Sequence, residues 1–141
     1  MVGRVRPRCR SLVCLWQDEI HRIRRSNKAR LHEIFSQIPG ARVIEEKEHA
    51  ETSWFGVPIV CDDHKHRLVK YLEDHKVQTR NYFAGNILMH PAYRHIEPAS
   101  NYPNACKVLD NVFFVGCSPV ITEPMLEYIG EVVSNYVKEN Y

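Results

Sequence analysis

The sequence predicts a mixed α/β (α+β) domain, in which helices pack on a small sheet of three to four strands after a long connecting helix. An apolar stripe at helical spacing runs through the first quarter of the chain. Short β-branched and aromatic segments then alternate with amphipathic segments. A length of 141 residues suits one folded unit with its own core. We therefore divide the chain into an irregular segment at 1–12, the connecting helix at 13–38 and a small domain at 39–141.

The long helix is predicted from apolar residues that recur at spacings of three and four. Pro39 and Gly40 end the pattern, as expected at a helix C-terminus. A helix of this length usually spans two packing units. We therefore expect its first half to expose apolar side chains and to drive self-association. The side chains in question are Trp16, Ile20 and Ile23.

The remaining elements follow from local patterns. The apolar, β-branched run at 52–61 indicates a central strand, although Pro58 lacks an N–H and favours a bulge or an edge there. Asp62 or Asp63 is expected to cap the following helix and Thr122 the last one. The other predicted elements are a short strand and charged turn in 41–51, a helix at 64–75, a strand at 77–83, a loop at 84–100, a helix at 102–110 opened by Asn101, a buried strand at 112–115 and a helix at 123–138.

Composition and charge exclude several classes of protein. No run of ~18 apolar residues predicts a membrane span, and no apolar segment follows the N-terminal arginines to make a secretory signal. The five scattered cysteines are typical of reduced thiols in a cytoplasmic protein. The eight histidines lack companion ligands at metal-binding spacing, so we expect no metal site.

The positive charge is concentrated in the first 30 residues, which hold nine Lys/Arg against two acids, a sum of +7 within a net charge of +2. Such asymmetry raises the alternative of a free-standing interaction or binding module that uses its basic helix to grip a partner. No nucleic-acid module signature accompanies it, and we expect no nucleic acid or membrane among the partners. The helix cations are Arg22, Arg24, Arg25, Lys28 and Arg30.

One stretch, TRNYFAGNILMHPAY at 79–93, differs from ordinary core sequence. Its arginine suits a carboxylate or phosphate, its histidine titrates near neutrality, and its rings offer flat walls. Asn86 follows a glycine and tolerates a left-handed backbone, which would aim its amide outward. A structured loop that caps the core fits these residues equally well. No phosphate-binding loop, zinc-protease or serine-hydrolase motif is present, and we predict no catalytic residue.

Three separated motifs, SWFGVPI, TRNYFAGNILMHPAY and VFFVGCSPVIT, resemble the C-terminal part of the DegT/DnrJ/StrS family. These are fold-type I pyridoxal-phosphate enzymes that act on nucleotide-linked keto-sugars. RRSNKARL resembles the family's connecting helix with its R-x-x-N pattern, here Arg24 to Asn27. The likeness runs from about Leu15 to the end. The FAGN form is closest to the NDP-hexose 3-dehydratase branch, whereas sugar aminotransferases usually carry Pro-Leu-His there.

The resemblance implies a C-terminal domain of an NDP-4-keto-6-deoxyhexose 3-dehydratase or sugar aminotransferase of deoxysugar and lipopolysaccharide O-antigen biosynthesis. The full-length family uses pyridoxal phosphate or pyridoxamine phosphate, held by a large domain that this chain lacks. We therefore expect the chain alone to bind no cofactor and to be inactive. The missing large domain or a homodimer partner would complete the site. The resemblance assigns Arg80, Phe83, Gly85, Asn86, His90 and Tyr93 to substrate binding, and Ser53 and Trp54 to support of the loop.

Overall fold

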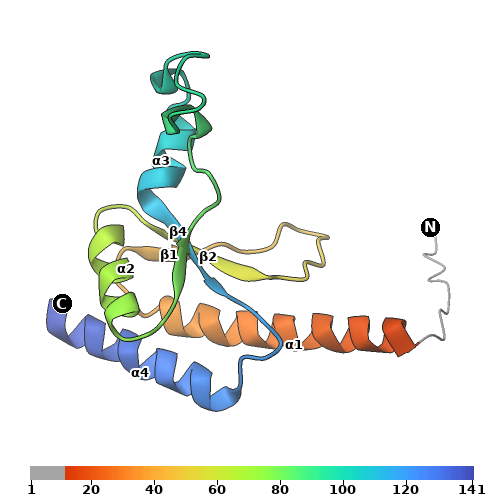
Figure 1. Ribbon diagram of the computed structural model, residues 1–141. Coiled ribbons are helices and arrows are strands. Elements are labelled where there is room, and N and C mark those ends of the chain that lie inside the picture. Colours follow the sequence, from red (N-terminus) through yellow and green to blue (C-terminus); the bar gives the residue numbers. More distant parts are fainter. Residues whose placement is uncertain (1–11) are drawn as a thin grey trace.

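The computed structural model describes residues 12–141 and contains a four-stranded antiparallel sheet with the strand order β1-β2-β4-β3. Helices lie against one side of the sheet, and a long arm rises from one end of it (Figure 1). The predicted fold class is therefore confirmed. The elements are α1 (Leu12–Phe35), β1 (Ala41–Val43), β2 (Gly56–Cys61), α2 (Lys65–Asp74), β3 (Thr79–Asn81), the 3₁₀ turns η1 (Ile87–Met89) and η2 (Ala99–Asn101), α3 (Pro103–Asn111), β4 (Val112–Gly116) and α4 (Glu123–Asn140).

The central strands β2 and β4 pair in continuous register from Gly56–Gly116 to Val60–Val112. No bulge interrupts the register at Pro58, but the alternative prediction of an edge there is confirmed locally, because Pro58 pairs with β4 and lies beyond the last β1 pair. Strand β1 ends opposite Ile59, and the Pro58 carbonyl accepts a hydrogen bond from the Ile44 N–H just beyond it (3.0 Å). In an antiparallel pair the N–H and C=O of one residue point the same way. The side of Pro58 that lacks an N–H therefore faces the end of β1. No β1–β2 pair is lost there, because the pairing already stops at Val43 and Ile59.

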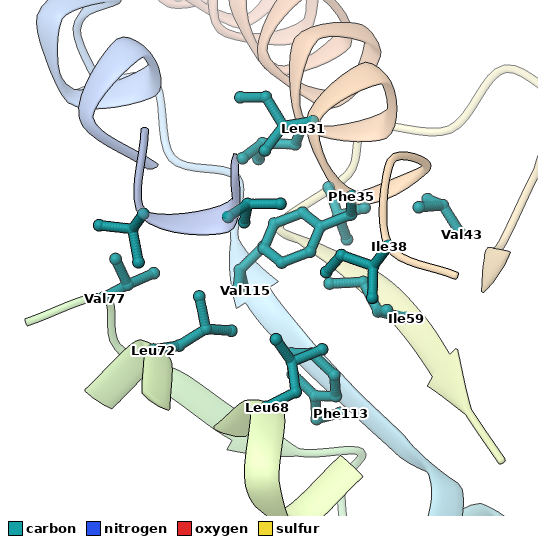
Figure 2. Packing of buried hydrophobic residues seen from close by; sticks show 14 of the residues in the cluster. Leu31, Phe35, Ile38, Val43, Ile59, Leu68, Leu72, Val77, Phe113 and Val115 are labelled. Carbon is teal, nitrogen blue, oxygen red and sulfur yellow. The ribbon is translucent and has the colours of Figure 1, made fainter. Parts of the chain in front are cut away.

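The core forms where one face of the sheet meets α1, α2 and α4 (Figure 2). Alternation along the central strands turns Ile59 and Phe113 towards this face. The Phe113 ring meets the Phe35 ring of α1 edge-on, with 6.5 Å between centroids. Full burial of one such side chain contributes about 1.5–3 kcal/mol. Helices α2 and α4 contribute Leu68, Leu72, Leu126, Val132, Val133 and Tyr136.

Helix α1 extends well past the sheet, so its first half lies away from the core (Figure 1). Trp16 is 71% exposed, as expected, whereas Ile20 and Ile23 are only partly exposed. The helix ends at Phe35, three residues before the predicted end. A turn through 36–38 follows it and leads into Gly40, which takes a left-handed backbone (φ 75°). None of the helices in residues 12–141 is long and apolar enough to cross a membrane.

The residues at the helix N-caps differ from those predicted for two of the three helices. His64 stands at the N-cap of α2, so the assignment of Asp62 or Asp63 is wrong. Tyr102, and not Asn101, stands at the N-cap of α3. Thr122 does occupy the N-cap of α4, but its side chain makes no capping hydrogen bond. Strand β3 spans only three residues, because the chain enters the arm directly after Asn81.

Candidate functional site

The face of the sheet opposite the core carries an aromatic cluster. Phe114 alternates with the buried Phe113 and therefore points away from the core. Three rings surround it: Phe55 at 5.5 Å, Phe83 at 6.2 Å and Tyr82 at 6.5 Å between centroids. Phe55 and Phe83 remain 54% and 65% exposed. This open aromatic cluster (Phe55, Tyr82, Phe83 and Phe114) lies outside the buried core and offers flat apolar walls.

A glycine makes room for the central ring of the cluster. A Cβ atom on Gly56 would lie 2.4 Å from Cδ2 of Phe114, which is well inside van der Waals contact. The ring therefore rests directly over the β2 backbone. Since Gly56 opens the SWFGVPI motif's strand, this close approach explains why that position carries no side chain.

Phe83 is held in a strained conformation. Its φ of 49° lies in the left-handed region, which bulky residues rarely adopt. Strain of this kind persists only where the surrounding structure enforces it, and it gathers at functional sites. Arg80, on the edge strand β3, lies opposite Phe114 in register and is exposed. The structure thus brings two predicted site residues, Arg80 and Phe83, to the open aromatic cluster.

Asn86 differs from its prediction. Its backbone is extended (φ −101°), and its side chain is 2% exposed. The amide nitrogen donates to the Ala99 carbonyl (3.0 Å) and to Sγ of Cys106 (3.1 Å), while the amide oxygen accepts from Leu88 N–H (3.1 Å). The expectation that Asn86 adopts a left-handed backbone and aims its amide outward is wrong. Gly85 takes the left-handed turn instead (φ 58°), which leaves Asn86 extended and turned inward.

Gly85 is also enclosed by the chain itself. A Cβ atom there would lie 2.6 Å from Cβ of Leu109 on α3. His90 and Tyr93 are exposed, and Nε2 of His90 lies 3.3 Å from the Ala84 carbonyl, next to Phe83. His90 therefore stands over the turn that carries Phe83, whereas Tyr93 lies one turn farther along the arm.

Sequence reasoning missed Phe55, Tyr82 and Phe114 as members of the site. The signal for Phe114 was present, because the pair Phe113-Phe114 in a strand must send one ring to each face. The contribution of Phe55 and Tyr82 depends on how the loops before β2 and after β3 approach that face. Such long-range geometry leaves no local pattern in the sequence.

The R-x-x-N pattern of α1 has a structural role. Asn27 is 6% exposed, and its amide nitrogen donates to the carbonyls of Ser118 (3.0 Å) and Ile121 (3.4 Å). The Arg24 carbonyl accepts a hydrogen bond from the Cys117 thiol (3.1 Å). Burial raises the pKa of this thiol to about 11. These contacts dock α1 on the turn that follows β4.

Most cations of the basic helix are neutralised within the chain. Arg22 pairs with Glu19 (2.6 Å), Arg25 with Glu46 (3.2 Å), Lys28 with Glu45 (2.5 Å) and Arg30 with Glu33 (2.9 Å). Four of the five cations singled out in the sequence thus have a carboxylate partner. An acidic or nucleic-acid partner would have to displace these carboxylates, which disfavours the basic-helix alternative.

Trp54 fastens the β1–β2 connection to α1, and not to the arm. Its indole N–H donates to Glu46 (2.9 Å), and the Lys28 ammonium lies 5.6 Å from its ring centroid. A hollow of about 390 Å³ opens between this connection and α1. Charged side chains line most of it, and they pair with one another.

The described residues do not fit pyridoxal phosphate. The one buried lysine, Lys65, is 4% exposed and donates to the Leu109 carbonyl, so its amine is already engaged. Burial lowers the pKa of this lysine. The neighbouring hollow of about 560 Å³ is lined by polar and charged residues alone, with no aliphatic or phenyl side chain to pack on a pyridine ring: Asp62, Asp63, His64, Lys65, His66, Arg67, Asp110 and Asn111. Among the side chains described, those of residues 16–141, no three His, Cys, Asp or Glu group so as to hold a metal ion.

Known proteins resemble this chain in sequence. A dTDP-4-dehydro-2,6-dideoxy-D-glucose 3-dehydratase of Saccharopolyspora spinosa is 34% identical over 123 residues, which cover 83% of this chain and 27% of that protein. The lipopolysaccharide biosynthesis protein RfbH of Salmonella typhimurium is 30% identical over 91 residues, which cover 60% of this chain and 21% of that protein. The chain thus spans about a quarter of the length of these curated relatives.

Solved structures share the fold. S. venezuelae DesV, solved in complex with a ketimine intermediate, superposes with a TM-score of 0.79 at 15% identity over 89% of this chain and 34% of that one. E. coli GDP-4-keto-6-deoxy-D-mannose-3-dehydratase with bound hydrated PLP superposes with a TM-score of 0.68 at 23% identity. The match covers 85% of this chain and 32% of that one. Residues 15–134 match the conserved family pattern along most of the chain. The chain belongs to the DegT/DnrJ/EryC1/StrS aminotransferase family.

Proposed function

We propose that this chain is the C-terminal, substrate-facing part of a pyridoxal-phosphate-dependent enzyme that modifies nucleotide-linked keto-sugars, and that it is inactive alone. The open aromatic cluster is the observation that carries this proposal. Large exposed apolar surfaces mark binding sites, and here two exposed phenylalanine rings lie beside a strained backbone and a free arginine. The cofactor and its chemistry belong to the remainder of the enzyme, because residues 12–141 do not fit it.

The cluster suits a nucleotide-linked sugar chemically. Aromatic faces stack on the apolar face of a sugar ring or on a base, and they exclude water from the bound ligand. Arg80, which lies opposite Phe114 in the strand register, carries a guanidinium with the fork of donors that binds a phosphate group. His90, above the Phe83 turn, supplies a ring nitrogen that can donate or accept a hydrogen bond. Tyr93 would extend the wall along the arm.

We propose the 3-dehydratase branch rather than a sugar aminotransferase. The relative that matches 83% of the chain at 34% identity is named a 3-dehydratase. The apolar Phe83 ring, in the FAGN motif, also fits a site that limits the access of water.

A nucleotide-sugar titration of the ¹⁵N-labelled chain tests this proposal. A dTDP-linked hexose should bind weakly, with a Kd on the order of 1 mM, because only one wall of the site is present. We expect chemical-shift changes at Arg80, Phe83 and Phe114. The substitution Phe83→Ala should abolish them, whereas Trp16→Ala, which removes an equally exposed ring from α1, should leave them unchanged. Shift changes confined to other parts of the chain would refute the assignment.

A further inference from the structure

The arm, residues 82–102, has almost no core of its own. Of the twelve large hydrophobic side chains that are exposed in the described residues, six lie in this short segment: Phe83, Ile87, Met89, Tyr93, Ile96 and Tyr102. Only Asn86 and Leu88 are buried between residues 82 and 102. Hydrophobic burial within the chain therefore does little to fix the shape of the arm.

A buried hydrogen-bond network holds the arm in shape where hydrophobic burial does not. The Asn86 amide joins both limbs of the arm to α3: it contacts the Leu88 N–H on the outgoing limb, the Ala99 carbonyl on the returning limb, and Sγ of Cys106 on α3. Each heavy-atom distance lies between 3.0 and 3.1 Å. The Cys106 thiol also lies 3.7 Å from the same Ala99 carbonyl, which closes the network. We call this set of residues the Asn86 latch.

Three further side-chain hydrogen bonds of the arm are exposed to solvent and hence weaker. Arg94 donates to the Met89 carbonyl (3.2 Å), and Tyr102 and Asn101 both donate to Glu97 (2.8 and 3.3 Å). Exposed side-chain bonds of this kind exchange readily with water and contribute little. A buried amide that loses its partners costs much more, because the carbonyl that remains is left unsatisfied.

The latch also determines where the site residues stand. The Asn86 carbonyl accepts from Met89 N–H (3.1 Å), and the next N–H, that of His90, donates to the Ile87 carbonyl (3.0 Å). This 3₁₀ turn carries the His90 ring back to Ala84, beside Phe83. Movement of Asn86 would therefore displace His90 from the turn that presents Phe83 to the open aromatic cluster.

We propose that Asn86 is a positioning residue, which locks the arm through Ala99 and Cys106 and so presents Phe83 and His90 to the substrate. The effect of Asn86 on substrate binding rests on the function proposed above. The ordering of the arm by Asn86, which we call the lock, is measurable without a ligand. In this assignment, Asn86 acts on the substrate only through the residues that it holds in place.

Residue-resolved amide hydrogen exchange on residues 1–141 tests the lock. The substitution Asn86→Leu removes the amide but keeps the branched shape of the side chain, so exchange at Leu88, Met89 and His90 should accelerate about ten- to a hundredfold. The β2 and β4 amides should keep their protection. Ile87→Ala, an exposed neighbour, is the matched control and should change exchange less than about threefold. Unchanged protection at Leu88 in Asn86→Leu would overturn the proposal.

The N86D variant gives a second readout, which holds even if Asn86→Leu fails to fold. An introduced carboxylate keeps the acceptor for Leu88 N–H but has no hydrogen to donate to Ala99. Its protonated form donates again, and burial raises the pKa of such a carboxyl. Cys106 is the titratable group in contact with this position. The arm of N86D should therefore be open near neutral pH and relock as the pH falls. The readout is the protection factor, which is the intrinsic exchange rate at each pH divided by the observed rate. Equal protection factors for the N86D arm at both pH values would contradict the lock.

Ligand binding separates this inference from the proposed function. If the wild-type chain binds the dTDP-linked hexose, N86D should bind it more weakly near neutral pH and recover at low pH, whereas Ile87→Ala should bind normally at both. A wild-type chain that binds no nucleotide sugar would refute the proposed function, while hydrogen exchange would still decide whether Asn86 locks the arm.

Discussion

The Asn27 amide donates a hydrogen bond to the Ser118 carbonyl, 3.0 Å away, and so joins residues 91 positions apart in the sequence. This contact links the connecting helix α1 to the turn between β4 and α4. The first half of α1 projects beyond the domain, so the angle of that projection depends on how firmly α1 is docked (Figure 1). Asn27 thus connects the domain core to the part of the helix that leaves it.

Substitution of Asn27 by leucine should destabilise the chain by about 1–3 kcal/mol, because the carbonyls of Ser118 and Ile121 lose their buried donor. Urea unfolding followed by circular dichroism measures the change. Ser26→Ala, on the exposed side of the same helical turn, is the control and should lie within about 0.5 kcal/mol of wild type. Equal midpoints for Asn27→Leu and wild type would show that the contact carries no stability.

Gly85→Ala should destabilise the chain, since the backbone there is left-handed and a Cβ atom would collide with Leu109. The backbone conformation alone costs roughly 1–2 kcal/mol for a residue with a side chain. Gly116→Ala provides a matched control, because a Cβ atom there would meet nothing within 4 Å. Thermal unfolding should therefore show a lower Tm for Gly85→Ala only. A Tm lowered equally by both substitutions would argue against the described turn.

Glu45 should make a small, pH-dependent contribution to stability. A hydrogen bond from the Lys28 ammonium, assisted by the nearby charges of Lys28 and His32, lowers the pKa of Glu45 below its ordinary value of 4.5. A depressed carboxyl pKa stabilises the fold above the unfolded-state value, and this stability is lost as the pH falls through the folded-state value. The side chain is 58% exposed, so water screens the pair and the effect at neutral pH should stay below about 1 kcal/mol.

Urea unfolding of Glu45→Gln between neutral pH and pH ~3.5 tests this linkage. The variant should be less stable than wild type near neutral pH and equal to it at the acid end. Glu131→Gln, on the exposed side of α4, should show no such convergence. A stability difference for Glu45→Gln that is the same at every pH would contradict the assigned ion pair.

Trp16 should promote weak self-association. It is the most exposed aromatic side chain on α1 at 71%, and it lies on the part of the helix that projects from the domain. Because Ile20 and Ile23 are partly covered, the patch is smaller than the sequence predicted. Sedimentation velocity over a range of concentrations should show association that Trp16→Ser reduces and that Val120→Ser, at a 77% exposed valine elsewhere, does not. A strictly monomeric wild-type chain would contradict this prediction.

Local sequence patterns predicted the secondary structure well in segments where apolar residues recur at regular spacing. Strand β4 begins at the predicted residue, because Val112 to Val115 form an unbroken β-branched and aromatic run. Helix α4 begins where Thr122 and Pro124 indicate, since proline is tolerated in a first helical turn. These features depend on neighbouring residues, and neighbouring residues are what a sequence shows directly.

The site was predicted less completely. Arg80 and Phe83 do lie at the open aromatic cluster, but Asn86 faces inward because its partners, Ala99 and Cys106, lie 13 and 20 residues farther along the chain. The sequence alone does not reveal which residue of the Gly85-Asn86 pair takes the left-handed turn. The close packing of Gly85 against Leu109 decides it, and this contact forms only after α3 folds back on the arm.

A chimeric enzyme tests the proposed role most directly. In the Saccharopolyspora spinosa 3-dehydratase, the matched segment of 123 residues would be replaced by the corresponding part of this chain. We expect the chimera to hold the cofactor, with absorbance near ~400 nm, and to dehydrate its nucleotide-linked sugar. Phe83→Ala and Arg80→Gln should each lower kcat/KM about ten- to a hundredfold, whereas Val120→Ser should not. A cofactor-loaded chimera that shows no turnover, or one that is insensitive to both substitutions, would contradict the assignment of this face to the substrate.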